Sequence, residues 1–251
     1  MSVPVNQTCA TEVDRARARL WFWLRNDAAR LLWPSRCLLC GERGDDALDL
    51  CPACVHGLPW NQWACPHCAM PLPGPPAVAC GTCLQRPPPL TRVHAACVYA
   101  APLDRLLPRF KFHHDLAAGR LLAQLMADAC ASQPRPDALV PVPLHRARLR
   151  QRGYDQALEL ARPLAGALQL PLHDHLLMRA RATAPQSELD ARARRRNLRD
   201  AFVVRGPRTL PAHVTLIDDV MTTGATLHAA AKALRRAGVA RVDAWVCARV
   251  P

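Results

Sequence analysis

The 251-residue chain has few lysines, few aromatic residues and no long apolar run. No run reaches the ~18–20 apolar residues of a membrane-spanning helix. The first ten residues lack a basic start followed by an apolar stretch, so no secretory signal is predicted either. Aromatic residues make up 5% of the chain, which leaves Trp60 and Trp63 as the main candidates for stacking on nucleic-acid bases.

Positive charge, by contrast, is abundant. The only lysines are Lys111 and Lys232, so the formal net charge of +13 comes almost entirely from arginine. Such a balance favours anionic partners, among them nucleic acid, phosphorylated metabolites and a lipid surface. With no predicted signal or spanning segment, the expected compartment is the cytoplasm.

Cysteine is abundant as well, with twelve residues, eight of them in four CxxC pairs. In a reducing cytoplasm, clustered cysteines bind metal more often than they form disulfides. Two CxxC turns aim four thiolates at one tetrahedral ion, and zinc accepts such a shell without redox chemistry. We therefore predict two structural zinc sites, with an iron–sulfur cluster as the minor alternative.

The spacing of the four pairs favours sequential pairing, although interleaved pairing stays open. Successive pairs are separated by ten, ten and eleven residues. The first two pairs would bind one ion and the last two the other. The predicted ligands are Cys37, Cys40, Cys51, Cys54, Cys65, Cys68, Cys80 and Cys83.

Three segments of different composition predict the domain organisation. Residues 1–34 contain an amphipathic helix at 11–33, which packs on the next module or, alternatively, makes peripheral contact with a membrane. Residues 35–88 are rich in cysteine and proline, so metal would replace the core that they cannot build. In residues 91–251 strands alternate with helices, which predicts an α/β domain whose parallel sheet is covered by helices.

The most specific signal is "VTLIDDVMTTGAT", residues 214–226. An apolar strand ends in Asp218 and Asp219, at the edge of the sheet where open α/β folds bind ligands. The following loop offers hydroxyls, a glycine and the N–H groups of a helix start, which suit a phosphate. It matches neither a Walker nor a GxGxxG loop. Because carboxylates accept hydrogen bonds from adjacent hydroxyls, the pattern predicts a ribose 5′-phosphate ligand.

Other basic residues could hold further phosphate. The planar guanidinium groups of Arg146, Arg148 and Arg152 follow a predicted strand and suit phosphate oxygens, unless the segment is merely a solvated charge run. Residues 179–202 hold seven arginines against three acids and have no apolar period, which is typical of a mobile segment. Lys111, in "FKFHH", is a third basic candidate.

"VTLIDDVMTTGAT" resembles the 5-phosphoribosyl pyrophosphate (PRPP) signature of type I phosphoribosyltransferases. The resemblance implies that Asp218 and Asp219 hold the ribose hydroxyls, that Mg²⁺ accompanies PRPP, and that residues 179–202 form a flexible catalytic loop. In that loop Arg194 and Asn197 are the expected functional residues, and Phe202 is an expected packing anchor. The implied ligands of the 5′-phosphate are Thr222, Thr223, Gly224, Ala225 and Thr226.

The chain as a whole resembles the ComF family of amidophosphoribosyltransferase-like competence proteins. The matching pieces include "LLWPSRCLLCG", "FKFHHD", "LVPVPLHRARLRQRGYDQA" and "APQSELDARARRRNLRDAF", and together with the PRPP signature they cover nearly all of residues 30–250. The resemblance implies a type I phosphoribosyltransferase-like fold preceded by a double zinc ribbon. It also implies a part in DNA uptake or DNA utilisation, with DNA-uptake machinery as partner.

The implied activity is a phosphoribosyl transfer whose acceptor the sequence does not name. The alternative is a non-catalytic protein on the same fold that binds single-stranded DNA or senses PRPP. Cys9 is not at the terminus, so release of ammonia from glutamine, as in true amidophosphoribosyltransferases, is not expected.

Overall fold

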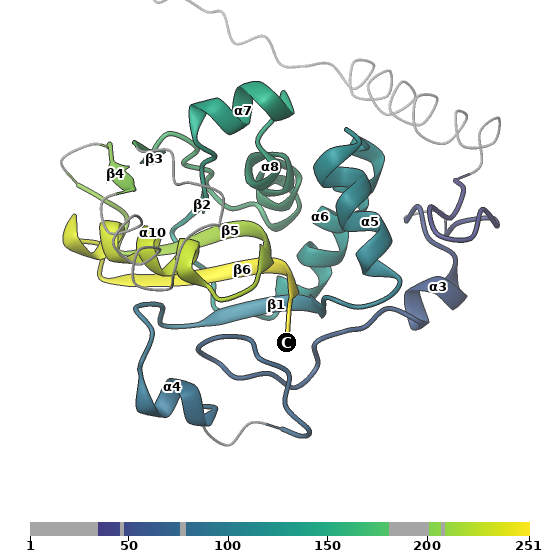
Figure 1. Cartoon of the computed structure of the whole chain (residues 1–251), viewed down its shortest axis with the longest axis horizontal. Coiled ribbons are helices and arrows are strands. Elements are labelled where there is room, and N and C mark those ends of the chain that lie inside the picture. The colour runs from purple at the N-terminus through teal and green to yellow at the C-terminus, as the bar shows by residue number, and fades with distance from the viewer. Residues whose placement is uncertain (1–34, 46–47, 76–78, 181–200, 207–208) are drawn as a thin grey trace, which may run out of the picture. The chain divides into compact units, whose positions relative to one another are not determined.

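The computed structural model describes residues 35–45, 48–75, 79–180, 201–206 and 209–251 (Figure 1). The chain divides into two compact units, Met1–His56 and Gly57–Pro251. The helix predicted at 11–33 lies outside the described residues.

The smaller unit is organised around the first four cysteines. A bridge between Arg36 and Arg43 closes the first CxxC turn, and the short helix α3 (Pro52–His56) carries Cys54 of the second pair and has no buried residue. Among the described residues of this unit, Leu50 is the one buried apolar side chain besides cysteines. So small a core fits the expectation that metal stabilises this segment.

The larger unit contains a four-stranded parallel sheet in the order β1-β6-β5-β2 (Figure 1). The strands are β1 (Val93–Val98), β6 (Arg241–Arg249), β5 (His213–Met221) and β2 (Ala138–Pro141). Most residues of the two central strands are buried, as expected when helices cover both faces of a parallel sheet.

Helices pack on both faces of this sheet (Figure 1). On one face α6 (Leu116–Cys130) and α8 (Gln156–Leu168) pack against each other and against the strands, with α5 (Leu103–Phe112) beside α6. On the other face α10 (Ala225–Arg236) packs against β5 and β6. The predicted α/β architecture is confirmed.

The remaining elements are short. After β2 the chain forms α7 (Arg146–Arg152), and β3 (Leu177–Arg179) pairs antiparallel with β4 (Phe202–Val204). The helix α4 (Gly81–Gln85) carries the last cysteine of the CxxC series.

The second pair of CxxC turns folds onto the α/β sheet. Residues 59–61 run along β1, since the Asn61 N–H donates to the Ala96 carbonyl at 3.0 Å. The Val93 N–H donates to the Pro66 carbonyl at 2.9 Å, and Ala69 is fully buried in the core shared with α10. By contact, residues 57–88 thus belong with the sheet, whereas the module boundary near residue 90 stays a prediction.

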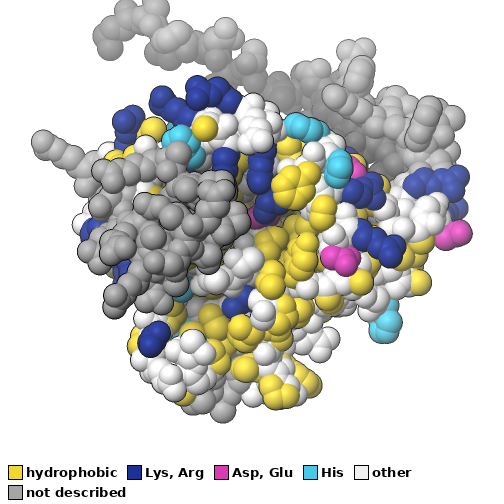
Figure 2. Space-filling view, in the orientation of Figure 1, with side chains coloured by type: hydrophobic (Ala, Val, Ile, Leu, Met, Phe, Trp, Pro, Cys, Tyr) yellow, Lys and Arg dark blue, Asp and Glu magenta, His cyan; other side chains and the backbone are white. Residues whose placement is uncertain are grey.

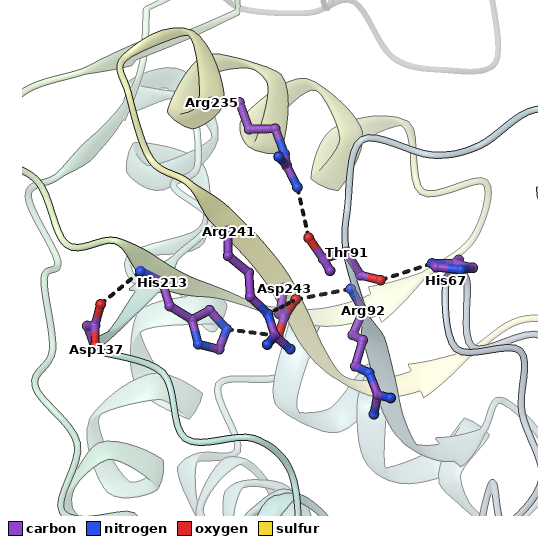
Figure 3. A network of polar contacts seen from close by, with 8 residues as sticks. All are labelled: His67, Thr91, Arg92, Asp137, His213, Arg235, Arg241 and Asp243. Atoms are coloured by element: carbon purple, nitrogen blue, oxygen red, sulfur yellow. Dashed lines mark hydrogen bonds and ion pairs between the residues drawn. The ribbon is translucent and has the colours of Figure 1, made fainter.

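A polar network joins the strands at the amino-terminal edge of the sheet (Figure 3). Asp243, whose side chain is 4% exposed, lies 2.8 Å from both His213 Nε2 and Arg241 Nη2 through its Oδ2 atom. Its Oδ1 atom accepts a hydrogen bond from the Arg92 N–H at 3.0 Å. One carboxylate therefore ties together the starts of β1, β5 and β6.

We expect Asp243→Ala to lower the free energy of unfolding by about 2–3 kcal/mol, because it leaves several donors at a nearly buried place without their acceptor. Urea denaturation followed by circular dichroism measures the loss. The control Asp174→Ala removes an acid whose histidine partner is exposed, and it should cost less than about 0.5 kcal/mol. Equal losses in the two variants would contradict a structural role for the network.

Candidate ligand-binding site and metal centres

The eight CxxC cysteines form two separate four-cysteine clusters. Within each cluster the Sγ atoms all lie within 4.8 Å of one another. The first cluster is Cys37, Cys40, Cys51 and Cys54, and the second is Cys65, Cys68, Cys80 and Cys83. This is the sequential pairing that the spacing favours, and no disulfide forms among the described cysteines.

The geometry of both clusters fits a tetrahedral metal. The Cys40 and Cys51 sulfurs are 3.7 Å apart, and so are the Cys68 and Cys80 sulfurs. A zinc–sulfur bond of ~2.3 Å in a tetrahedron places neighbouring sulfurs ~3.8 Å apart. The four sulfurs of each cluster therefore suit one zinc ion, with every coordination position filled by the protein.

Backbone groups favour thiolate at one cysteine of each cluster. Burial raises the pKa of Cys37, but N–H groups of Cys51, Cys40 and Leu39 outweigh burial and lower that pKa to about 6. Burial likewise opposes ionisation of Cys65, and backbone hydrogen bonds, the largest from Cys80, bring its pKa to about 7. The pKa values of Cys40, Cys54, Cys68 and Cys83 are instead raised. Since thiolate is the form that binds metal, the protein by itself favours the metal-binding form at only one cysteine with a lowered pKa in each cluster, and a bound cation would favour it at the others.

A cavity of about 580 Å³ lies at the carboxyl ends of β5 and β2. Its lining includes four cationic side chains and three carboxylates, together with an apolar wall from α5 and the end of β2. The charged side chains are Lys111, Arg148, Arg152, Arg179, Asp155, Asp218 and Asp219.

The two adjacent aspartates of β5 lie in this cavity in different environments. Asp219 is nearly buried, and its Oδ2 atom forms an ion pair of 2.7 Å with Lys111 Nζ from α5. Asp218 Oδ1 accepts a hydrogen bond from the Asp219 N–H at 2.9 Å. Burial, followed by repulsion from Asp219, raises the pKa of Asp218 well above its usual range. A ligand that donates hydrogen bonds or brings a cation would therefore favour the ionised pair.

The loop after β5 joins a left-handed glycine to the start of a helix, where backbone N–H groups favour an anion. Gly224 has φ +74° and precedes the first turn of α10, and a Cβ there would lie 2.4 Å from the Met221 methyl group. The left-handed conformation favours glycine at this position, whereas the Met221 methyl group, at the end of a flexible side chain, could shift to make room. The N–H groups at the start of this twelve-residue helix then face the loop, where they favour an anion. Of the loop residues, Thr222 and Thr226 line the cavity.

The arginines of α7 divide between the cavity and the solvent. Arg148 and Arg152 are four residues apart, so they share one face of the helix, and both line the cavity. Arg146 is exposed and is not among the lining residues. In Figure 2 several basic side chains lie at the top of the view, where Figure 1 places α7, and others are spread over the rest of this face.

Comparison with known proteins identifies the family of this chain. Residues 28–84 match a family model described as a double zinc ribbon domain. The DNA utilization protein YhgH of Salmonella typhi is 39% identical over 225 residues, which cover 86% of this chain and 97% of that protein. Competence protein F of Haemophilus influenzae is 35% identical over 226 residues, or 85% of this chain and 96% of that protein. The chain belongs to the ComF family.

A more distant ComF relative matches a shorter part of the chain. Competence protein ComFC of Bacillus subtilis is 31% identical over 147 residues, covering 57% of each chain. Among the described helices of this ComF protein, none combines the length and apolarity that a membrane span requires.

Two residues that line the cavity of this ComF protein, Asp155 and Arg179, were not predicted as site residues from the sequence. Asp155 begins α8 and accepts hydrogen bonds from the N–H groups of Leu144, Ala157 and Leu158 at 2.9, 3.1 and 3.3 Å. Burial raises its pKa. An aspartate just before an apolar helical pattern is a helix-capping signal, so the sequence could have shown this role.

No local sequence pattern distinguishes Arg179 as a residue of the cavity. It is one of seven arginines in a polar segment, and only the fold brings it from β3 into the cavity. Its guanidinium lies 5.5 Å from the ring centroid of Phe202, which is buried, as expected of a packing anchor. Arg194 and Asn197 lie outside the described residues.

We expect Asp218→Asn to raise the melting temperature of the ligand-free ComF protein at neutral pH by roughly 2–4 °C. The raised pKa of Asp218 means that ionisation is costly in the folded state, and asparagine removes the charge. The pKa of Asp218 is higher in the folded than in the unfolded state. Its ionisation therefore does not destabilise the fold at a pH below the unfolded pKa, and destabilises it fully at a pH above the folded pKa.

Thermal unfolding of both proteins across roughly pH 4 to 8, a range that starts near the ordinary aspartate pKa, measures this difference. The difference in melting temperature between Asp218→Asn and wild type should shrink as the pH falls. The control Asp128→Asn changes an exposed acid of α6 that does not line the cavity. A variant less stable than wild type at neutral pH, or a gain that does not depend on pH, would contradict the account.

Proposed function

We propose that this ComF protein binds PRPP in the cavity at the carboxyl ends of β5 and β2 and transfers its phosphoribosyl group during the utilisation of DNA. One observation carries the proposal: carboxylates, two threonines around the start of α10 (Thr222 and Thr226) and arginines from separate parts of the sequence all line the same cavity. Each suits a different part of a phosphorylated ribose.

The parts of PRPP match the lining groups as follows. Asp218 and Asp219 accept hydrogen bonds from the ribose hydroxyls, and the loop from Thr222 to Thr226 holds the 5′-phosphate. Arg148 and Arg152 are left for the diphosphate, since a guanidinium donates two hydrogen bonds to phosphate oxygens at once. Because Lys111 pairs with Asp219 in the free protein, a ligand must compete with that ammonium group or bind beside it.

The donor set also suits Mg²⁺ brought in with the diphosphate. Carboxylate oxygens are ligands that Mg²⁺ prefers, usually alongside substrate phosphates and water. Burial, and after it repulsion from Asp219, raises the pKa of Asp218, and a bound cation would favour its ionised form. Mg²⁺ at Asp218 and Asp219 would supply charge neutralisation for the diphosphate.

The transfer breaks the bond between the anomeric carbon and the diphosphate and forms a bond to the acceptor, which loses its proton. Arg148 and Arg152 would stabilise the charge that develops on the departing diphosphate. Positioning of the two reactants supplies the rest of the rate enhancement. Arg194 and Asn197 are proposed to complete the site from the 181–200 segment.

The apolar wall of the cavity favours a flat aromatic acceptor, such as a nucleobase. It consists of Leu107, Pro108, Phe112, Val142 and Pro143. Phe112 is 60% exposed, and the Arg152 guanidinium lies 5.3 Å from its ring centroid. An exposed ring held by a cation at the mouth of a ribose-phosphate cavity can stack on a base.

The names of the relatives, DNA utilization protein and competence protein, support a role in handling DNA taken up from outside. The second candidate function is binding of single-stranded DNA without transfer. The net charge of +13 and the exposed Arg146 and Arg150 of α7 favour it. Such binding depends on phosphate contacts, so its affinity would fall steeply with salt.

Calorimetric titration with PRPP and Mg²⁺ tests the proposal. We expect Asp218→Ala/Asp219→Ala to weaken binding at least about 100-fold, since it removes the charged partners of two hydroxyls. Arg152→Ala should weaken binding about tenfold through loss of one charge-assisted contact. Its matched control, Arg146→Ala, removes an arginine of the same helix that does not line the cavity, and it should bind as wild type does.

Single-stranded DNA titrated in parallel separates the two functions. Binding of PRPP that is lost in the aspartate variant supports the ribose-phosphate site. No binding of PRPP, together with salt-sensitive binding of DNA, would rule out the transferase and leave the DNA-binding function.

A further inference from the structure

Arg249, the last residue of β6, lies between the second cysteine cluster and residues 222–226, called the phosphate loop because they are proposed to hold the 5′-phosphate. Its side chain is nearly buried, with the residue 6% exposed. Nε donates to the Cys68 carbonyl at 2.9 Å, and Nη1 donates to the Met221 carbonyl at 3.2 Å. Nη1 also contacts the carbonyl of Val250. One guanidinium thus binds a residue of each site directly.

The Cys68 end of this contact is part of the metal-binding turn. Cys68 is a ligand of the second cluster, and the next residue, Ala69, has φ +54° and is fully buried in the core. The Ala69 N–H donates to the Cys65 carbonyl at 2.8 Å. This turn is unfavourable for a residue with a Cβ, so an ion that joins Cys65 and Cys68 would help to hold its shape, together with the hydrogen bond from Asn61 Nδ2 to the Ala69 carbonyl.

The Met221 end of the contact is the base of the phosphate loop. Met221 closes β5 and directly precedes Thr222. Its carbonyl also accepts a hydrogen bond from the Val250 N–H at 3.0 Å, and its methyl group fills the space beneath Gly224. A shift of Met221 would therefore move the residues that are proposed to hold the 5′-phosphate.

Electrostatic attraction would strengthen the contact between Arg249 and a metal-loaded second cluster. Four thiolates and one Zn²⁺ carry a net charge of about −2. The Arg249 guanidinium interacts electrostatically with Cys68, Cys80 and Cys83, so a loaded cluster attracts this buried cation. Loss of the ion would change both the charge and the turn that Arg249 binds.

We propose that Arg249 is a positioning residue that couples metal in the second cysteine cluster to the order of the phosphate loop. Loss of metal from the cluster at Cys65, Cys68, Cys80 and Cys83 loosens the loop. Loss of metal from the cluster at Cys37, Cys40, Cys51 and Cys54, in the other compact unit, does not. The part of the inference that concerns ligand affinity rests on the proposed function, whereas the part that concerns loop order does not.

Hydrogen–deuterium exchange of the zinc-loaded full chain, read at the peptide covering residues 221–228, tests the coupling without a ligand. In Arg249→Lys the charge stays, but a point ammonium cannot hold carbonyls that are arranged around a planar fork. We expect exchange of that peptide to quicken at least about tenfold, the scale for losing a hydrogen bond to a charged donor. Cys83→Ser, which disables the second cluster, should quicken it similarly.

Two matched controls separate coupling from general loss of stability. Cys54→Ser disables the first cluster, and Arg241→Gln removes an arginine from the other end of β6 that pairs with Asp243 (Figure 3). Neither should change exchange at residues 221–228. Metal analysis should find about two zinc ions in wild type and one in each cysteine variant.

The outcomes for this inference and for the proposed function are distinguishable. Unchanged loop exchange in Arg249→Lys overturns the coupling, whether or not Cys83→Ser folds. Equal quickening in Cys54→Ser or Arg241→Gln also overturns it. If wild type fails to bind Mg²⁺–PRPP while loop exchange responds as expected, the proposed function fails and the coupling stands. If both hold, Arg249→Lys should weaken PRPP binding about fivefold or more.

Discussion

Two carboxylates on consecutive residues at the end of a buried strand are costly to keep ionised, and much of the cavity compensates for this cost. Lys111 pairs with Asp219, but burial and, after it, the charge of Asp219 still raise the pKa of Asp218. Folded proteins retain such charge conflicts mainly at functional sites. A ribose, which donates hydrogen bonds, or a divalent cation would relieve this conflict, which supports the proposed function.

Metal in the cysteine clusters would compensate for the small number of buried apolar side chains around them. In the smaller unit, few apolar side chains other than cysteines are buried among the described residues. The second cluster differs because its turn contributes Ala69 to the core of the α/β unit. Its metal would therefore stabilise a turn that belongs to the sheet carrying the cavity. Two clusters of the same composition thus have different structural consequences.

Local patterns predicted much of this protein, because strand alternation, CxxC spacing and the loop after β5 are all encoded within short windows. What the sequence could not show depends on contacts between distant segments. Lys111 reaches Asp219 across 108 positions, and Arg249 reaches Cys68 across 181 positions. Arg179 enters the cavity only because β3 folds back toward it. Helix periodicity on α7 could have separated Arg148 and Arg152 from Arg146, since residues three or four apart share a face and residues two apart do not.

A crystal structure of the zinc-loaded chain with PRPP and Mg²⁺ tests the central claim most directly. The account predicts the 5′-phosphate against the N–H groups of residues 222–226, the ribose hydroxyls at Asp218 and Asp219, and the diphosphate beside Arg148 and Arg152. Density for PRPP elsewhere on the chain, or a phosphate lodged on the exposed arginines of α7 instead, would contradict it.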